Sequence, residues 1–167
     1  MPYEIIRRQS TFWDLRGNNR VVERVHFVGK EEFGFSEGVV PSFEILEAHP
    51  LLMEYQAPWA MVYAAQPVSA SAQITRELEG AIEAEVAPWR SPSRYLNSVG
   101  LEQLLSAGHG QILDAPAPIV DVCVAVLDAA RVPFNRLAGR PARSSPKAFI
   151  AGVNYVVAKN FSVERVA

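Results

Sequence analysis

Cysteine is almost absent from the sequence, since Cys123 is the single one among 167 residues. One thiol excludes an internal disulfide and a cysteine cage for zinc. Histidine is scarce as well, because only His26, His49 and His109 occur, and they are far apart in the sequence. We therefore expect no metal site, and Cys123, set between two valines, is typical of a buried structural thiol.

Long apolar runs are also missing. No stretch approaches the roughly 20 consecutive apolar residues that cross a bilayer. The opening Met1-Pro2-Tyr3-Glu4 lacks the basic start and the apolar stretch of a secretory signal. Because a single cysteine also fits a reducing compartment, the sequence predicts a cytoplasmic protein that does not contact a membrane.

Motifs that would name a reaction or a cofactor are lacking too. The sequence contains no Walker phosphate loop and no zinc-binding HExxH. Gly108-His109-Gly110 is not a dinucleotide fingerprint, because such a loop follows a strand and opens a helix, whereas here a helix is predicted before it. We expect no cofactor, and these absences favour a protein that is not an enzyme without deciding the question.

What is present is the composition of an ordinary globular domain, with 49% apolar and 20% charged residues. This is far from the low hydrophobicity and high charge of disordered chains. A chain of this length is of common size for one domain with one core. We predict a single domain over residues 1–167.

The first third of the chain is predicted to be rich in β-structure. Residues 3–15 and 20–28 have the pattern of two strands, and Gly17-Asn18-Asn19 between them suits the tight turn of a β-hairpin. Glycines and prolines then punctuate a stretch with many apolar residues, residues 29–58, which is typical of short strands and loops.

The rest of the chain alternates strands with helices. Ile74, Leu78 and Ile82 repeat at helical spacing in a predicted helix that Ser71 would cap. Two further helices are expected, a short one that ends at Gly108 and one that Pro118 opens. The predicted helices are 71–86, 101–107 and 118–130, and the predicted strands are 60–65, 111–113, 132–137 and one or two within 148–166. This order predicts an α+β fold with a mixed sheet, some parallel strand pairing, and two main helices packed on the sheet.

Charge is segregated along the chain. Residues 31–88 contain ten Asp/Glu and a single Lys/Arg, whereas residues 1–30 and 89–167 are net positive. An acidic surface repels nucleic acid and attracts basic proteins. Six glutamates come from separate predicted elements of this block, and we expect them to form one binding face: Glu44, Glu47, Glu54, Glu77, Glu79 and Glu83.

These features favour a small non-enzymatic protein-binding domain whose partner is a protein with a basic surface rather than a nucleic acid. Its most concrete version is an inhibitor or immunity-type protein that neutralises a basic bacterial toxin. The toxin inhibitor is proposed only by analogy with such inhibitors as a class, because many other proteins also combine a small domain, an acidic segment and no catalytic motif.

A second hypothesis is a small α/β enzyme that acts on a phosphorylated or acidic metabolite. Here His109, which two glycines flank, would be the general base, and Arg140 and Arg143 would hold the anion. This hypothesis predicts a pocket in which His109 and at least one arginine converge. A third possibility, a structural or assembly subunit, would show an unpaired edge strand or a large apolar patch. The sequence does not indicate an oligomeric state.

Overall fold

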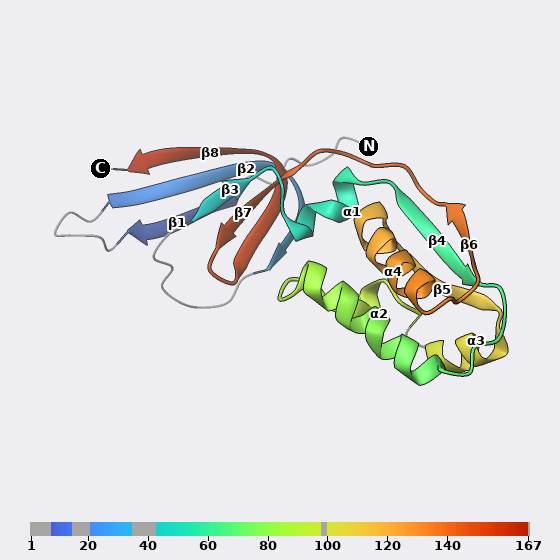
Figure 1. Cartoon of the computed structure of the whole chain (residues 1–167). Helices are drawn as coiled ribbons and strands as arrows, with labels where there is room; N and C mark the ends of the chain where they lie inside the picture. Colours follow the sequence, from blue (N-terminus) through green and yellow to red (C-terminus); the bar gives the residue numbers. More distant parts are fainter. Residues whose placement is uncertain (1–7, 15–20, 35–42, 98–99, 167) are drawn as a thin grey trace. The chain divides into compact units, whose positions relative to one another are not determined.

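The computed structural model describes residues 8–14, 21–34, 43–97 and 100–166. The chain divides into two compact units (Figure 1). Unit 1 consists of residues 1–52 and 145–167, and unit 2 consists of residues 53–144. Unit 2 is therefore continuous in sequence, whereas the two ends of the chain make unit 1. This division does not test the prediction of a single domain over residues 1–167, which stays a prediction.

The predicted α+β class is confirmed, but the strands form two antiparallel sheets rather than one mixed sheet. Each strand pair in the described part of the chain is antiparallel. In unit 2, β5 (Gly110–Pro116) and β6 (Phe134–Ala138) are joined by helix α4 (Ala117–Ala129), and both pair antiparallel with β4 (Trp59–Ala64). These two strands thus run in the same direction, as a helical crossover requires. Because β4 lies between them, the expected parallel hydrogen bonds do not form.

Unit 1 is a five-stranded sheet in the order β1-β2-β8-β7-β3. Its strands are β1 (Arg8–Asp14), β2 (Val21–Gly34), β3 (Glu44–Leu46), β7 (Lys147–Ala151) and β8 (Asn154–Val166), and a 3-10 helix η1 (Pro50–Leu52) follows β3. Strands β1 and β2 pair as the predicted hairpin, while the expected turn at 17–19 lies outside the described residues. Strand β2 continues beyond its predicted end, through a bulge between Lys30 and Glu32.

The core of unit 1 is small and rich in aromatic residues. Val25 and Phe27 lie two residues apart on β2 and therefore face this core together, with 2% and 4% of their surface exposed. Phe149 of β7 is 1% exposed and packs against the rings of Phe43 and Phe161, at centroid distances of 5.1 and 6.1 Å. Such ring pairs stabilise a core beyond the area that they bury.

Unit 2 combines the sheet β5-β4-β6 with helices. They are α1 (Met53–Gln56), α2 (Ser71–Val86), the 3-10 helix η2 (Pro92–Arg94), α3 (Leu101–Ala107) and α4. Helix α3 has the predicted bounds, α2 ends at Val86 as predicted, and α4 begins and ends one residue earlier than predicted. Ser71 is the first residue of α2 rather than its cap, and its hydroxyl pairs with that of Ser106 at 2.8 Å.

The core of unit 2 is larger and mainly aliphatic. Leu78 and Ile82 of α2, Leu105 of α3, Ile112 of β5 and Leu127 of α4 are all completely buried in it. Cys123 belongs to the same cluster, and burial raises the pKa of its thiol to about 12. A thiol with this pKa stays protonated, as the structural interpretation of Cys123 expects. The continuous core holds the strand ends and loops that carry the site described next.

Candidate functional site

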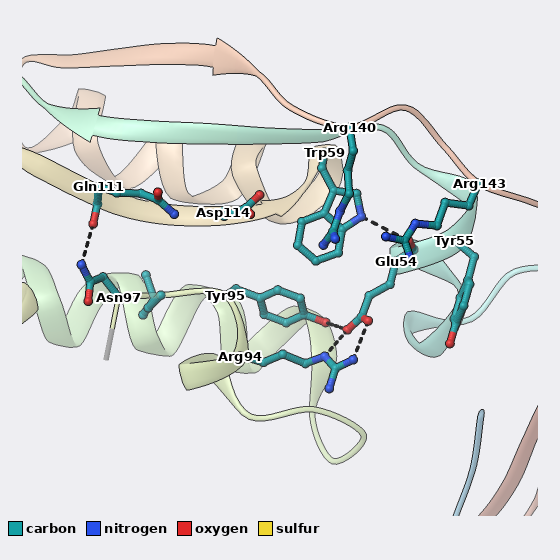
Figure 2. A pocket seen from close by; sticks show the side chains of 11 residues that line it. Glu54, Tyr55, Trp59, Arg94, Tyr95, Asn97, Gln111, Asp114, Arg140 and Arg143 are labelled. Carbon is teal, nitrogen blue, oxygen red and sulfur yellow. Dashed lines mark hydrogen bonds and ion pairs between the residues drawn. The ribbon is translucent and has the colours of Figure 1, made fainter. Parts of the chain in front are cut away.

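A polar pocket of about 670 Å³ lies within unit 2 (Figure 2). Its charged lining consists of Glu54, Arg94, Asp114, Arg140 and Arg143. The volume is in the range of pockets that hold small molecules, roughly 300–1,000 Å³. A mixture of cations, carboxylates and aromatic rings in one pocket makes it the strongest candidate for a binding site in unit 2.

Aromatic and amide side chains complete the lining. They come from four parts of unit 2: helix α1, the first residue of β4, the segment after η2, and β5. The residues are Tyr55, Trp59, Tyr95, Asn97 and Gln111, with the apolar Leu96. Trp59 is 9% exposed and Tyr95 is 2% exposed, so both rings form a fixed wall rather than a mobile surface.

Backbone hydrogen bonds hold one side of the pocket. The segment after η2 runs beside β5 as an extra short strand, with an antiparallel bridge between Leu96 and Leu113. The Asp114 N–H donates to the Tyr95 carbonyl at 3.0 Å, and the Asn97 N–H donates to the Ile112 carbonyl at 2.9 Å. The lining residues of this side are therefore fixed by sheet-like pairing.

The opposite side is fixed by the chain that follows β6. The Trp59 N–H donates to the Arg140 carbonyl at 2.8 Å, and the Arg143 N–H donates to the Tyr55 carbonyl at 2.9 Å. The Trp59 indole donates to the Glu54 carbonyl at 3.1 Å. These bonds attach a segment without regular secondary structure to α1 and β4, and so give both arginines a defined place.

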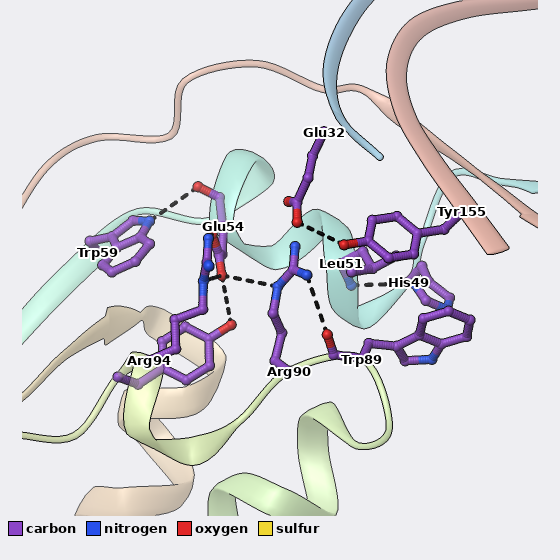
Figure 3. Close-up of polar contacts among 10 residues, drawn as sticks. Glu32, His49, Leu51, Glu54, Trp59, Trp89, Arg90, Arg94 and Tyr155 are labelled. Atoms are coloured by element: carbon purple, nitrogen blue, oxygen red, sulfur yellow. Dashed lines mark hydrogen bonds and ion pairs between the residues drawn. The ribbon is translucent and has the colours of Figure 1, made fainter. Parts of the chain in front are cut away.

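Glu54 is the centre of an ion-pair network (Figures 2 and 3). The Arg94 guanidinium donates to both of its carboxylate oxygens, at 2.7 Å for the Nη2 contact, and the Tyr95 hydroxyl donates to it at 2.8 Å. The Arg90 Nε lies 3.4 Å from the same carboxylate, and the Glu54 and Arg90 side chains are only 9% and 5% exposed. This carboxylate is therefore neutralised within unit 2.

Burial by itself would raise the pKa of Glu54. The hydrogen bonds from Arg94 and Tyr95, together with the charges of Arg94 and Arg90, outweigh this effect and lower its pKa below the ordinary value of 4.5. Burial also raises the pKa of Tyr95 far above its ordinary range, and the charge of Glu54 adds to this. Glu54 is thus ionised and Tyr95 protonated at neutral pH, which suits a fixed structural network.

Arg140 and Arg143 differ from Arg94. The Arg140 guanidinium lies over the Trp59 ring, 3.5 Å from its centroid, in a cation–π contact. Within residues 8–14, 21–34, 43–97 and 100–166, neither Arg140 nor Arg143 forms an ion pair with a carboxylate. Both side chains line the pocket from exposed positions. Their guanidinium groups are therefore available to bind an anionic ligand.

His109 is not among the residues that line this pocket. Its imidazole is exposed, and the Nδ1 atom lies 3.1 Å from the Ala107 carbonyl. Gly108 before it has a φ of +75°, and a Cβ there would come within 2.1 Å of the Pro67 nitrogen. The structure thus brings Arg140 and Arg143 together in one pocket and leaves His109 outside it, whereas the enzyme hypothesis expects His109 and an arginine to converge.

The six glutamates of the predicted acidic face lie in different settings. Glu44 and Glu47 belong to unit 1, where Glu47 pairs with Lys147 at 2.6 Å. Glu54 faces inward to its arginines rather than outward to a partner. The remaining three are exposed on helix α2, and these are Glu77, Glu79 and Glu83. Glu77 accepts a hydrogen bond from Gln73 at 2.8 Å.

Sequence reasoning did not assign Trp59, Tyr95 or Asp114 to a site. The sequence carries one signal for this site: Arg90, Arg94 and Tyr95 lie close together in a proline-containing loop before the helix predicted over 101–107. Their acidic partner was not recognisable, since Glu54 precedes Arg94 by 40 residues.

The spacing G-x-S-x-G of a nucleophile elbow occurs at residues 34–38, but Gly34 ends β2 and residues 35–38 lie outside the described residues. Across the described ranges, no three His, Cys, Asp or Glu side chains are grouped so that they would hold a metal ion.

Among the described residues, no helix is long and apolar enough to cross a membrane. Comparison with protein-family models, curated proteins and solved structures found no match to this chain.

Proposed function

We propose that unit 2 binds a small organic anion, a carboxylate or a phosphate ester, in the pocket that Arg140 and Arg143 line. The observation that carries this proposal is the contrast between the arginines. Arg94 and Arg90 are both paired with the Glu54 carboxylate, whereas the guanidinium groups of Arg140 and Arg143 have no carboxylate partner in the described part of the chain.

The chemistry of these groups supports an anionic ligand. A guanidinium presents a planar set of donors that matches carboxylate and phosphate oxygens, and such charge-assisted bonds are about twice as strong as neutral ones. The Trp59 ring holds the Arg140 guanidinium at 3.5 Å, so little side-chain freedom is lost when a ligand binds. The Arg140 side of the pocket is therefore preorganised for an anion.

The Glu54 network supports the site in a second way. Without Arg94 and Arg90, its carboxylate would repel an anion from the same pocket. Because the charges of Arg94 and Arg90 more than offset that of Glu54, this carboxylate does not oppose the binding of an anion by Arg140 and Arg143, and its hydrogen bond fixes Tyr95. Glu54 thus acts as a structural residue of the pocket rather than as a docking residue.

Isothermal titration calorimetry with propyl phosphate and with propanoate tests the proposal. We expect the double variant Arg140→Gln/Arg143→Gln to lose at least about tenfold in affinity, because it loses two charge-assisted contacts. Arg76→Gln is the matched control, since Arg76 is exposed on α2 and does not line the pocket.

Equal binding by the wild type, the double variant and the control would refute the proposal. The same applies if the wild type binds neither of these anions nor a phosphate ester that also carries a hydroxyl or ammonium group. Thermal unfolding of each variant establishes that it is folded, and exposed substitutions of this kind cost little stability.

Recognition of a basic protein partner, which the sequence favours, stays a second proposal. Its support is reduced to helix α2, where the exposed Glu77, Glu79 and Glu83 stand with Arg76 as the nearest base in the sequence. Recovery of partners from a lysate of the native organism with and without Glu77→Lys/Glu79→Lys/Glu83→Lys tests it, and unchanged recovery would contradict it.

A further inference from the structure

Asp114 is the one pocket residue whose presence an anion alone does not explain. Its carboxylate lines the same pocket as Arg140 and Arg143, and no ion pair joins it to either of them. Unlike Glu54, it has no arginine partner among the described residues. A carboxylate in an anion site weakens the binding of a simple anion by Coulomb repulsion.

Strand register places Asp114 close to the arginine end of the pocket. Asp114 of β5 pairs with Met61 of β4, and Trp59 lies two residues before Met61 on the same strand. This is a diagonal cross-strand relation, with a separation of about 7–8 Å. Because the Arg140 guanidinium lies on the Trp59 ring, a single small molecule can reach both Asp114 and Arg140.

Amide groups continue the pocket beyond Asp114. Figure 2 shows Gln111 and Asn97 on the far side of Asp114 from Arg140. The Asn97 amide donates to the Gln111 carbonyl at 3.1 Å, and the Gln111 side-chain oxygen accepts from the Tyr63 hydroxyl at 3.3 Å. The pocket thus has a cationic end, at Arg140 and Arg143, and a polar end with a carboxylate as its strongest acceptor.

We infer that the ligand is bipolar: an anion at one end, held by Arg140 and Arg143, and hydroxyl or ammonium donors at the other end, which bind Asp114. This inference rests on the proposed function and adds the ligand class. An ionised carboxylate accepts hydrogen bonds and donates none, so only a ligand with donors offsets the desolvation of Asp114. A ligand without donors leaves that charge unpaired.

Three phosphate esters of equal chain length test the inference by calorimetry. Propyl phosphate has no donor at its far end, 3-hydroxypropyl phosphate has a hydroxyl, and 3-aminopropyl phosphate has an ammonium group. We expect the wild type to bind at least one donor-bearing ester about tenfold more tightly than propyl phosphate, as for a hydrogen bond to a charged group. Whichever ester binds more tightly identifies the donor as hydroxyl or ammonium.

Asp114→Asn supplies the decisive comparison. We expect this variant to lose the preference for the donor-bearing ester and to bind propyl phosphate about threefold more tightly, because a like charge is removed. Asp114→Glu keeps the charge, and we expect it to keep the sign of the preference. Asp128→Asn is the matched control, since Asp128 is exposed on α4 outside the pocket, and we expect wild-type ratios from it.

The failures of the two proposals are distinguishable. If the esters bind through Arg140 and Arg143 but Asp114→Asn changes all three affinities by the same factor, the bipolar ligand is refuted and the anion site stands. If no ester binds to the wild type, both proposals are refuted.

Discussion

Units 1 and 2 differ in the size of their buried cores and in the exposure of the ion pairs described above. Unit 1 is an all-antiparallel sheet in which six buried residues, among those described, form the core around Phe149. Unit 2 places twenty described residues in one buried cluster that connects helices and sheet. One ion pair of unit 1, Glu47 with Lys147, is on the surface, whereas the paired side chains of Glu54 and Arg90 in unit 2 are only 9% and 5% exposed.

The comparison shows where a defined pocket can form. Polar groups at the edge of a large core have places set by buried neighbours and backbone pairing, as at Trp59, Tyr95 and Asp114. An exposed pair such as Glu47 and Lys147 is solvated and contributes little to stability. The anion site proposed for unit 2 depends on this difference in support.

The largest expected effects come from truncation of the two cores. Phe149→Ala removes a large, fully buried side chain of unit 1 with its ring contacts to Phe43 and Phe161, and we expect a loss of about 3–5 kcal/mol. Leu78→Ala in unit 2 should cost about 2–5 kcal/mol. Because unit 1 has fewer other core contacts among the described residues, we expect Phe149→Ala to remove hydrogen-exchange protection throughout β7 and β8.

In Leu78→Ala, by contrast, we expect β4 and β5 to stay protected, although less strongly. Hydrogen exchange followed by mass spectrometry reports each unit separately. Protection in β7 and β8 that survives Phe149→Ala would show that the smaller core is not the more vulnerable one.

A smaller effect is expected from matched glutamate substitutions. Glu54→Gln leaves Arg90, whose side chain is 5% exposed, beside a neutral amide. Removal of a charged hydrogen-bond partner of this kind costs about 1–3 kcal/mol, because Arg90 and Arg94 lose a carboxylate that pairs with both of them. Glu47→Gln should leave the free energy of unfolding nearly unchanged, since the Glu47 side chain is 77% exposed. Urea unfolding measures both, and equal losses would contradict the distinction between the units.

The smallest expected effect is a pH dependence of the Glu54 contribution. Because the folded pKa of Glu54 lies below its ordinary value of 4.5, ionised Glu54 stabilises the protein fully above that pH. The contribution is lost as pH falls through the lowered folded pKa. The stability difference between the wild type and Glu54→Gln should therefore shrink on acidification. A difference that is constant or grows as pH falls would show that the network does not act through this charge.

The helices were predictable from the sequence because their signals are local. Ile74, Leu78 and Ile82 follow the helical repeat, and Gly108 ends α3 in the left-handed conformation that glycine adopts without strain. The antiparallel pairing of β5 and β6 with β4 was not predictable, since it depends on which strand lies between them. Sequence order does not specify that neighbour.

The candidate site was predictable only in part, for the same reason. Arg140 and Arg143 stood out as a basic loop of turn-forming residues, and both line the pocket. Glu54 was assigned to an outer face, because the local acidic context does not reveal that Arg90 and Arg94 pack against it from a distant part of the chain. Asp114 could not be assigned to the site from the sequence, because its place there depends on the register of β5 against β4.

The most direct test of the anion site is a titration followed on the arginine side chains themselves. Nuclear magnetic resonance of the Nε–H groups in ¹⁵N-labelled protein distinguishes Arg140 and Arg143 in the pocket from Arg76 and Arg136 outside it. On addition of 3-hydroxypropyl phosphate, we expect saturable shifts of the Arg140 and Arg143 resonances and none beyond the general salt effect at Arg76 and Arg136. Shifts of equal size at all four arginines would mean that the anion associates non-specifically with surface charge, and would contradict a specific anion site at Arg140 and Arg143.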